Sequence, residues 1–152
     1  MCIVIDMNTI PKVFDKKNLF HTEFEPVYNW ILNDIGKFVI GGTTYYGELS
    51  KMSSYLRFVN ILRDKKKVIK VQDNLVDNEE NKIIEFLNDK KCDDPHILAL
   101  LKVSKCQLLC SNDDRMFPYI RKVYTKNRPK IYYSSKNINL LNIKNIPKIY
   151  QN

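Results

Sequence analysis

The sequence predicts an α/β fold, a three-layer α/β/α sandwich with a central, mainly parallel sheet of about five strands. Short apolar runs without alternation, typical of strands buried on both faces, recur along the chain. Amphipathic helical patterns separate these runs, which is the order expected when helices cover a parallel sheet. With 152 residues, of which 44% are hydrophobic and 28% charged, the chain has the size and composition of one globular domain. We therefore expect a single domain over residues 1–152, neither disordered nor membrane-spanning.

The first half of the chain predicts two strands and two helices. Residues 2–5 are an uninterrupted apolar run and are expected to form the first strand. Pro11 prevents a long helix directly afterwards, and the next helical pattern covers residues 23–33. Residues 37–40 repeat the strand pattern and end at a glycine pair typical of a turn. From residue 47 to 64 apolar side chains recur at spacings of three and four, which predicts one amphipathic helix.

The second half predicts the remaining strands and helices. Residues 67–71 are a strand candidate, and a helical pattern follows near residues 79–87, with Ile83, Ile84 and Leu87 expected to face inward. Asp93-Asp94-Pro95 predicts the start of a helix to about Ser104, because Asp accepts from free N–H groups and Pro is tolerated in the first turn. The last expected elements are a strand, a short helix that begins at Asp113 or Asp114, and a final strand, at residues 106–110, 113–122 and 130–133.

The cysteines and the start of the chain predict a cytoplasmic setting. Four cysteines do not make a dense disulfide framework in a chain of this size. We interpret them as small buried apolar side chains, at Cys2, Cys92, Cys106 and Cys110. Asp6 interrupts the first apolar run, so no secretory leader is expected.

Charge is unevenly distributed along the chain. Residues 1–50 have a net charge of −2, from 4 Lys+Arg and 6 Asp+Glu, whereas residues 51–152 have a net charge of +10. From residue 115 to the end there are nine basic residues and no acidic one, interleaved with five tyrosines. This pattern predicts a basic C-terminal segment, residues 123–152 with a last strand and a tail, and a nucleic-acid-binding face. We expect five cations to contact nucleic acid: Arg115, Arg121, Lys122, Lys126 and Arg128. The alternative is that the composition reflects an AT-rich genome.

Four acidic residues fall at predicted strand ends and helix starts. Asp6 closes the first strand, Glu48 is placed in the first turn of a helix, Asp94 opens another helix and Asp113 follows the fourth strand. The carboxyl ends of parallel strands share one edge of the sheet, so we expect these acids to gather there. Such a cluster repels itself unless pKa values rise or cations bind, and oxygen ligands prefer Mg²⁺ or Mn²⁺. Each acid taken singly has a structural alternative as a helix cap, a first-turn residue or a turn residue.

These segments resemble a PIN-domain nuclease over residues 2 to about 122. The family pattern has an apolar strand ending in Asp-x-Asn, as in Ile5-Asp6-Met7-Asn8. It continues with an acid in a helix start, as at Glu48, and a helix of the type Asp-x-x-Ile-x-Ala, as from Asp94 to Ala99. A Ser-x-Asp pattern after an apolar strand completes it, as in Ser111-Asn112-Asp113. Many members place a further acid where this chain has Arg115, and Asp114 is the candidate replacement.

The resemblance implies a metal-dependent endoribonuclease with Mg²⁺ or Mn²⁺ as cofactor and RNA, single-stranded or structured, as substrate. Asp6, Glu48, Asp94 and Asp113 would hold the ion. Asn8 and Ser111 would give nearby polar support, and Asp93 would be a helix cap or an outer-shell group. Many relatives are toxins paired with an antitoxin and many form homodimers, so both partners are expectations here.

Other interpretations stay open from the residues alone. A nucleic-acid-binding adaptor would keep the fold without the ion. A haloacid dehalogenase-like phosphatase would need an acid two residues after Asp6, where this chain has Asn8. Cys92 with His96, four residues apart, makes a zinc site conceivable. His96 is either a phosphate contact beside Asp94 or an ordinary polar residue in the first turn of a helix.

Overall fold

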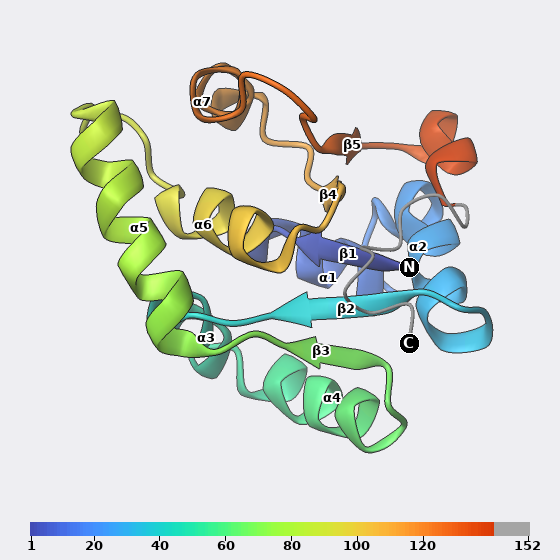
Figure 1. Ribbon diagram of the computed structural model, residues 1–152. Helices are drawn as coiled ribbons and strands as arrows, with labels where there is room; N and C mark the ends of the chain where they lie inside the picture. Colours follow the sequence, from blue (N-terminus) through green and yellow to red (C-terminus); the bar gives the residue numbers. More distant parts are fainter. Residues whose placement is uncertain (142–152) are drawn as a thin grey trace.

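The computed structural model describes residues 1–141 and confirms the predicted fold class. Five parallel strands form one sheet in the order β3-β2-β1-β4-β5 (Figure 1). The strands are β1 (Cys2–Ile5), β2 (Lys37–Ile40), β3 (Val68–Lys70), β4 (Leu108–Cys110) and β5 (Lys130–Tyr132). All five strand predictions are therefore confirmed, and of the predicted basic C-terminal segment residues 142–152 lie outside the described part.

Helices cover both faces of this sheet. They are α1 (Ile10–Phe14), α2 (His21–Asn33), α3 (Thr43–Ser50), α4 (Ser53–Asp64), α5 (Asp73–Leu87), α6 (Pro95–Ser104) and α7 (Phe117–Val123), with 3₁₀ turns η1 (Met7–Thr9), η2 (Asp114–Met116) and η3 (Ser135–Leu140). The chain moves from β1 to β2 and β3 in one direction and then returns to β4 and β5, so right-handed crossovers put the helices before β3 on one face of the sheet and the helices after β3 on the other. Accordingly α1 packs with α2 and α4, and α5 packs with α6 and α7 (Figure 1). No helix within residues 1–141 is long and apolar enough to cross a membrane.

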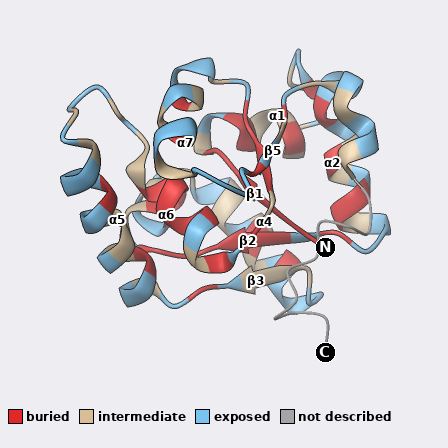
Figure 2. Ribbon diagram, turned by 45° about the horizontal axis from the view of Figure 1, so that its top comes forward, coloured by how far each residue is buried: buried red, intermediate tan, exposed pale blue. Residues whose placement is uncertain are grey.

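The central strand β1 is fully buried, as its uninterrupted apolar run predicts. Neighbouring strands cover both of its edges and helices cover both of its faces (Figure 2). β4 lies beside β1 and is likewise buried along its whole length. Any polar group placed directly after these two strands therefore begins in the interior of the molecule.

The predicted helix over residues 47–64 is wrong, because two helices cover this region. α3 ends at Ser50 and α4 begins at Ser53, and Met52 between them has φ −111° and ψ 68°, outside the helical region. Both helices turn apolar residues, Leu49 and Val59, into the same core, so the apolar spacing continues across the break. Glu48 consequently lies in the last turn of α3 and not in the first turn of a long helix.

The helix predicted near residues 79–87 is longer and is oriented differently. α5 begins at Asp73, soon after β3, and ends at Leu87, where the following Asn88 has the left-handed conformation. Ile84 was expected to face inward together with Ile83, but Ile84 is 49% exposed. Adjacent helical residues point about 100° apart, and the packing of α5 against α6 takes only the side that carries Ile83.

Gly36 is expected to be intolerant of a side chain. A Cβ at this position would collide with the indole ring of Trp30, a buried residue of α2. Gly36→Ala should lower the free energy of unfolding by about 1–3 kcal/mol through overpacking. Gly47→Ala is the matched control, because a Cβ there meets no neighbour within 4 Å and should stabilise α3 by up to about 1 kcal/mol. Equal denaturant midpoints for the two variants would contradict the packing described for Trp30.

Candidate active site

The first and fourth acidic segments meet at the point where the strand order reverses. In an open parallel sheet the crevice outside the carboxyl ends of the strands at this point is the usual ligand site. Here it lies between β1 and β4, which are followed directly by Asp6 and Ser111. The Ser111 hydroxyl donates a hydrogen bond to Asp6 Oδ2 at 3.0 Å. A buried carboxylate and its hydroxyl partner therefore mark the switch point.

Asp6 is only 2% exposed, and its surroundings include groups that raise its pKa and groups that lower it. Burial raises the pKa of the Asp6 carboxyl above its ordinary value of 3.8. Hydrogen bonds from Ser111 and from the backbone N–H of Asn8 lower the pKa, whereas the negative charge of Asp113 raises it. Asn8 thus supports Asp6 through its main chain, and its side chain is exposed.

Asp94 shares this crevice with the other three predicted acids. It occupies the N-cap position of α6, in place of Asp93, but its carboxylate makes no capping hydrogen bond. Burial, together with the charges of Asp6, Glu48 and Asp113, raises the pKa of Asp94 to about 6, although His96 lowers it. The structure therefore places the four acids close enough to influence one another across a single edge.

Glu48 reaches the edge because Tyr45 anchors α3 to the end of β1. The buried Tyr45 hydroxyl donates a hydrogen bond to the backbone oxygen of Ile5 at 2.7 Å. Glu48 lies three residues later, on the same side of the helix. Its Oε2 is 3.0 Å from Nε2 of His96, whose ring is 1% exposed. His96 is therefore positioned to orient Glu48. A phosphate contact, one of the two roles considered for His96, stays a prediction.

Asp113 is held by a cation from its own chain. Arg115 Nε donates to Asp113 Oδ1 at 2.9 Å, and Arg115 Nη2 donates to Oδ2 at 2.7 Å. This side-chain hydrogen bonding lowers the pKa of Asp113 and raises the pKa of Arg115. Arg115 Nη1 also lies 3.6 Å from Oδ2 of the exposed Asp93. Asp114, which opens η2, is exposed and forms no ion pair in the described part of the chain.

The arrangement leaves two acids for a cation. Within residues 1–141 no group of three or more His, Cys, Asp or Glu side chains is arranged to hold a metal ion. Glu48 is bonded to His96 and Asp113 is bonded to Arg115, whereas Asp6 and Asp94 form no ion pair in the described structure. The donor chemistry at Asp6 and Asp94, two carboxylates of raised pKa, suits a hard divalent cation.

The sequence reasoning missed three features of this site. The anchoring role of Tyr45 and the pairing of His96 with Glu48 depend on elements far apart in the chain. The pairing of Arg115 with Asp113 is local, and an Arg two residues after an acid at a predicted helix start was its available signal.

A basic surface follows the acids directly in the chain. Arg121 and Lys122 lie in the last turn of α7, while Lys126 and Arg128 lie in the connection to β5. All four side chains are exposed, and we call them the basic α7 face. Lys122 Nζ lies 5.5 Å from the ring centre of Tyr119, a distance typical of a cation–π contact. The position of these cations after β4 is compatible with the predicted nucleic-acid face.

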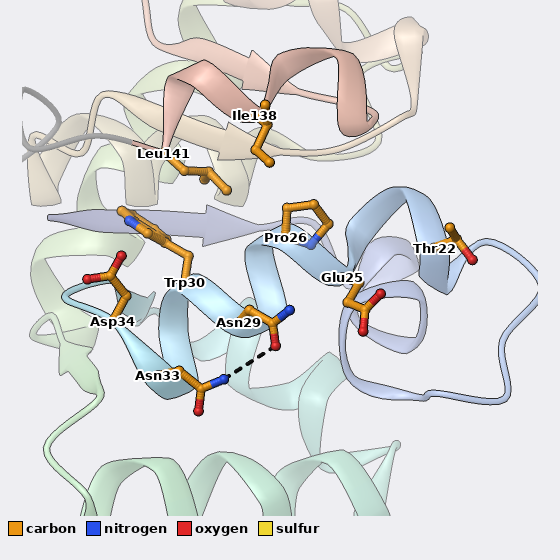
Figure 3. Close-up of a pocket in the computed structure, with 9 residues that line it drawn as sticks. All are labelled: Thr22, Glu25, Pro26, Asn29, Trp30, Asn33, Asp34, Ile138 and Leu141. Carbon is orange, nitrogen blue, oxygen red and sulfur yellow. Dashed lines mark hydrogen bonds between the residues drawn. The ribbon is translucent and has the colours of Figure 1, made fainter.

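A cavity of about 580 Å³ lies elsewhere, between α2 and η3 (Figure 3). Trp30 and Pro26 from α2 and Ile138 and Leu141 from the C-terminal side line it. None of the four predicted acids contributes to its wall. The cavity is therefore separate from the candidate active site.

Ser111 is expected to be important for stability because it is bonded on two sides. Besides donating to Asp6, its oxygen accepts a hydrogen bond from the backbone N–H of Asp113 at 3.1 Å. Ser111→Ala should lower the free energy of unfolding by about 1–2 kcal/mol, because both partners lose a hydrogen bond in a dry environment. Ser50→Ala, which removes an exposed hydroxyl bonded to a backbone oxygen, should change it by less than about 0.5 kcal/mol. Chemical denaturation of both variants measures the difference, and equal values would argue against a structural role for Ser111.

Comparison of the chain with protein-family models, with curated proteins and with solved structures found no match. The interpretation of the site therefore depends on the placement and chemistry of its own residues.

Proposed function

We propose that the protein is a divalent-cation-dependent endoribonuclease of the PIN-domain type. The observation that carries the proposal is the pair Asp6 and Asp94, two carboxylates of raised pKa at this edge of the sheet, where the charge of Asp6 is one cause of the raised pKa of Asp94. Holding two carboxylate charges close together is unfavourable, and a bound cation would offset their repulsion. Perturbed carboxylates in a crevice are typical of active sites.

Asp6 and Asp94 would hold the Mg²⁺ or Mn²⁺ ion, with Glu48 and Asp113 beside them. When bound, such an ion lowers the pKa of a water molecule and neutralises charge on a phosphodiester. Hydrogen bonds from the Ser111 hydroxyl and from the backbone N–H of Asn8 hold the Asp6 carboxylate in position, and the contact with His96 orients Glu48. The basic α7 face would bind RNA phosphates and align the strand along the edge of the sheet.

Location and partners belong to the same proposal. No disulfide bond joins the four cysteines, all of which lie in the described part of the chain, and this suits a reducing cytoplasm. An antitoxin and a homodimer, both implied by the PIN resemblance, stay predictions that a pull-down and a measurement of molecular mass would test.

Incubation of the purified protein with mixed single-stranded and structured RNA tests the activity. We expect cleavage with Mn²⁺ or Mg²⁺ and none with EDTA, because the ion activates the attacking water. Asp6→Asn is the inactive control, and far-UV circular dichroism should show that it is folded. Cleavage that is indifferent to EDTA, or that persists in Asp6→Asn, would contradict the proposal.

A second candidate is a nucleic-acid-binding adaptor without catalysis. Two observations favour it: Glu48 is bonded to His96 and Asp113 to Arg115, and no group of three possible ligands among the described residues is arranged to hold a metal ion. An adaptor would bind RNA with the same affinity in Mn²⁺ and in EDTA and would leave the RNA intact.

A further inference from the structure

Arg115 lies beside Asp113 at the acidic edge of the sheet and donates three hydrogen bonds to its carboxylate. Its guanidinium engages both carboxylate oxygens of Asp113, and its backbone N–H donates to Oδ1 of the same residue at 3.1 Å. The Asp113 side chain is only 14% exposed, whereas the Arg115 side chain is 69% exposed. The carboxylate thus lies inside the site, and its cation approaches from solvent.

This pairing has two effects on a cation bound at Asp6 and Asp94. The guanidinium competes with an ion for the Asp113 oxygens, because it forms a two-bond ion pair with both of them. It also adds a positive charge to an edge where Asp113 acts on the charges of Asp6 and Asp94. Both effects weaken the binding of a divalent ion while Arg115 stays in place.

The same guanidinium is well suited to a phosphate. Its planar set of donors matches phosphate and carboxylate oxygens equally, in a two-bond geometry that Lys cannot reproduce. The side chain is mostly exposed and lies only six residues before Arg121, the first residue of the basic α7 face. Because the guanidinium is mostly exposed, it can exchange one oxyanion partner for another in contact with water, where an ion pair contributes little to stability.

We propose that Arg115 is a latch, by which we mean a side chain that keeps Asp113 from binding the ion until RNA displaces it. Without RNA it holds Asp113, and the site binds its divalent ion weakly through Asp6 and Asp94. A backbone phosphate of the RNA takes over the guanidinium, Asp113 becomes available, and the ion binds tightly. The proposal rests on the proposed function, and it adds that cation and RNA bind with positive coupling, which is reciprocal by thermodynamic linkage.

The test measures Mn²⁺ affinity from the electron paramagnetic resonance signal of the free ion, with and without a short phosphorothioate RNA that resists cleavage. For the unaltered protein we expect this RNA to tighten Mn²⁺ binding by about tenfold, within the usual range of coupling between sites. Arg115→Gln should bind Mn²⁺ about tenfold more tightly than the unaltered protein without RNA. In that variant the RNA should add little further, because the latch is already open.

Two controls separate the latch from a general effect of charge. Arg115→Lys keeps the charge but lacks the two-bond geometry, so it should resemble Arg115→Gln more than the unaltered protein. Arg121→Gln removes an equal charge that does not contact Asp113, and without RNA its Mn²⁺ affinity should stay near that of the unaltered protein. Equal tightening by Arg115→Gln and Arg121→Gln would overturn the latch, because charge alone would then explain it.

The remaining outcomes distinguish the latch from the proposed function. If the unaltered protein and Arg115→Gln bind Mn²⁺ equally, and RNA affects neither, the latch is wrong and the cation site stands. If neither protein binds Mn²⁺ under any condition while both are folded, the proposed function fails, and the latch fails with it.

Discussion

Asp94→Asn is expected to abolish RNA cleavage and to make the folded protein more stable at neutral pH. The substitution keeps the shape of the side chain and its position at the start of α6, and it removes the charge. Loss of an ion ligand should reduce the cleavage rate by about 100-fold or more, since even supporting groups around metal sites are worth about 10–100-fold. A substitution that lowers activity and raises stability is typical of a functional site.

The gain in stability follows from the direction of the pKa shift. Burial, and then the charge of Asp6, raise the pKa of Asp94 from 3.8 to about 6, so the folded state holds its proton to higher pH than the unfolded state. Stability is therefore lost as the pH rises from about 4 to about 6, and the full penalty is present at neutral pH. Because Asp94 is partly solvated, we expect Asp94→Asn to recover about 1–2 kcal/mol.

Thermal unfolding as a function of pH measures this effect. Asp94→Asn should melt at a temperature higher by roughly 3–6 °C at neutral pH and at the same temperature as the unaltered protein below the ordinary pKa. Asp114→Asn is the matched control, because Asp114 is exposed and forms no ion pair in the described part of the chain. A variant at Asp94 that is less stable at every pH would show a structural residue and a misplaced site.

Reversal of the basic α7 face is expected to remove most of the affinity for RNA. If about four of its cations contact phosphates, counterion release gives a slope of log affinity against log salt of roughly −3 for a single strand. Changing Arg121, Lys122, Lys126 and Arg128 to Glu should flatten this slope and weaken binding on the order of 100-fold at low salt. The affinity for Mn²⁺ without RNA should change little, because exposed charges are screened beyond about 10 Å.

A second quadruple variant separates a binding face from net charge. Four exposed cations on the α3–α4 side of the molecule, at Lys51, Arg57, Arg63 and Lys65, can be changed to Glu with the same change in net charge. RNA affinity measured over a range of salt should keep its steep slope in this control. Equal slopes in the two variants would mean that the C-terminal cations reflect composition alone.

The sequence predicts which acidic residues lie at the edge of this sheet better than it predicts the side chains that these residues contact. Asp6 could be placed because the apolar run before it has no alternation and must be a buried strand. Asp94 could be placed because an Asp followed by Pro begins a helix. In both cases local chemistry determines where the residue lies along its element, and parallel pairing then brings the elements to one edge.

The contacts that modify the site could not be predicted in the same way. Glu48 meets His96 across 48 residues of chain, and only the packing of α3 near α6 brings them together. The break between α3 and α4 has no signal in apolar spacing, because both helices face one core. Arg115 is the clearest example. Its charge predicted a contact with RNA, whereas in the structure its side chain is paired with Asp113.

The position of a bound cation tests the account most directly. Sub-stoichiometric Mn²⁺ added to ¹⁵N-labelled protein broadens the NMR signals of amides near the ion. We expect the signals of Asp6, Ser111 and Asp94 to broaden first, and the indole signal of Trp30, the single tryptophan, to stay sharp. Broadening centred on the acidic residues of α2, or no selective broadening in a folded protein, would contradict a cation site at the carboxyl ends of β1 and β4.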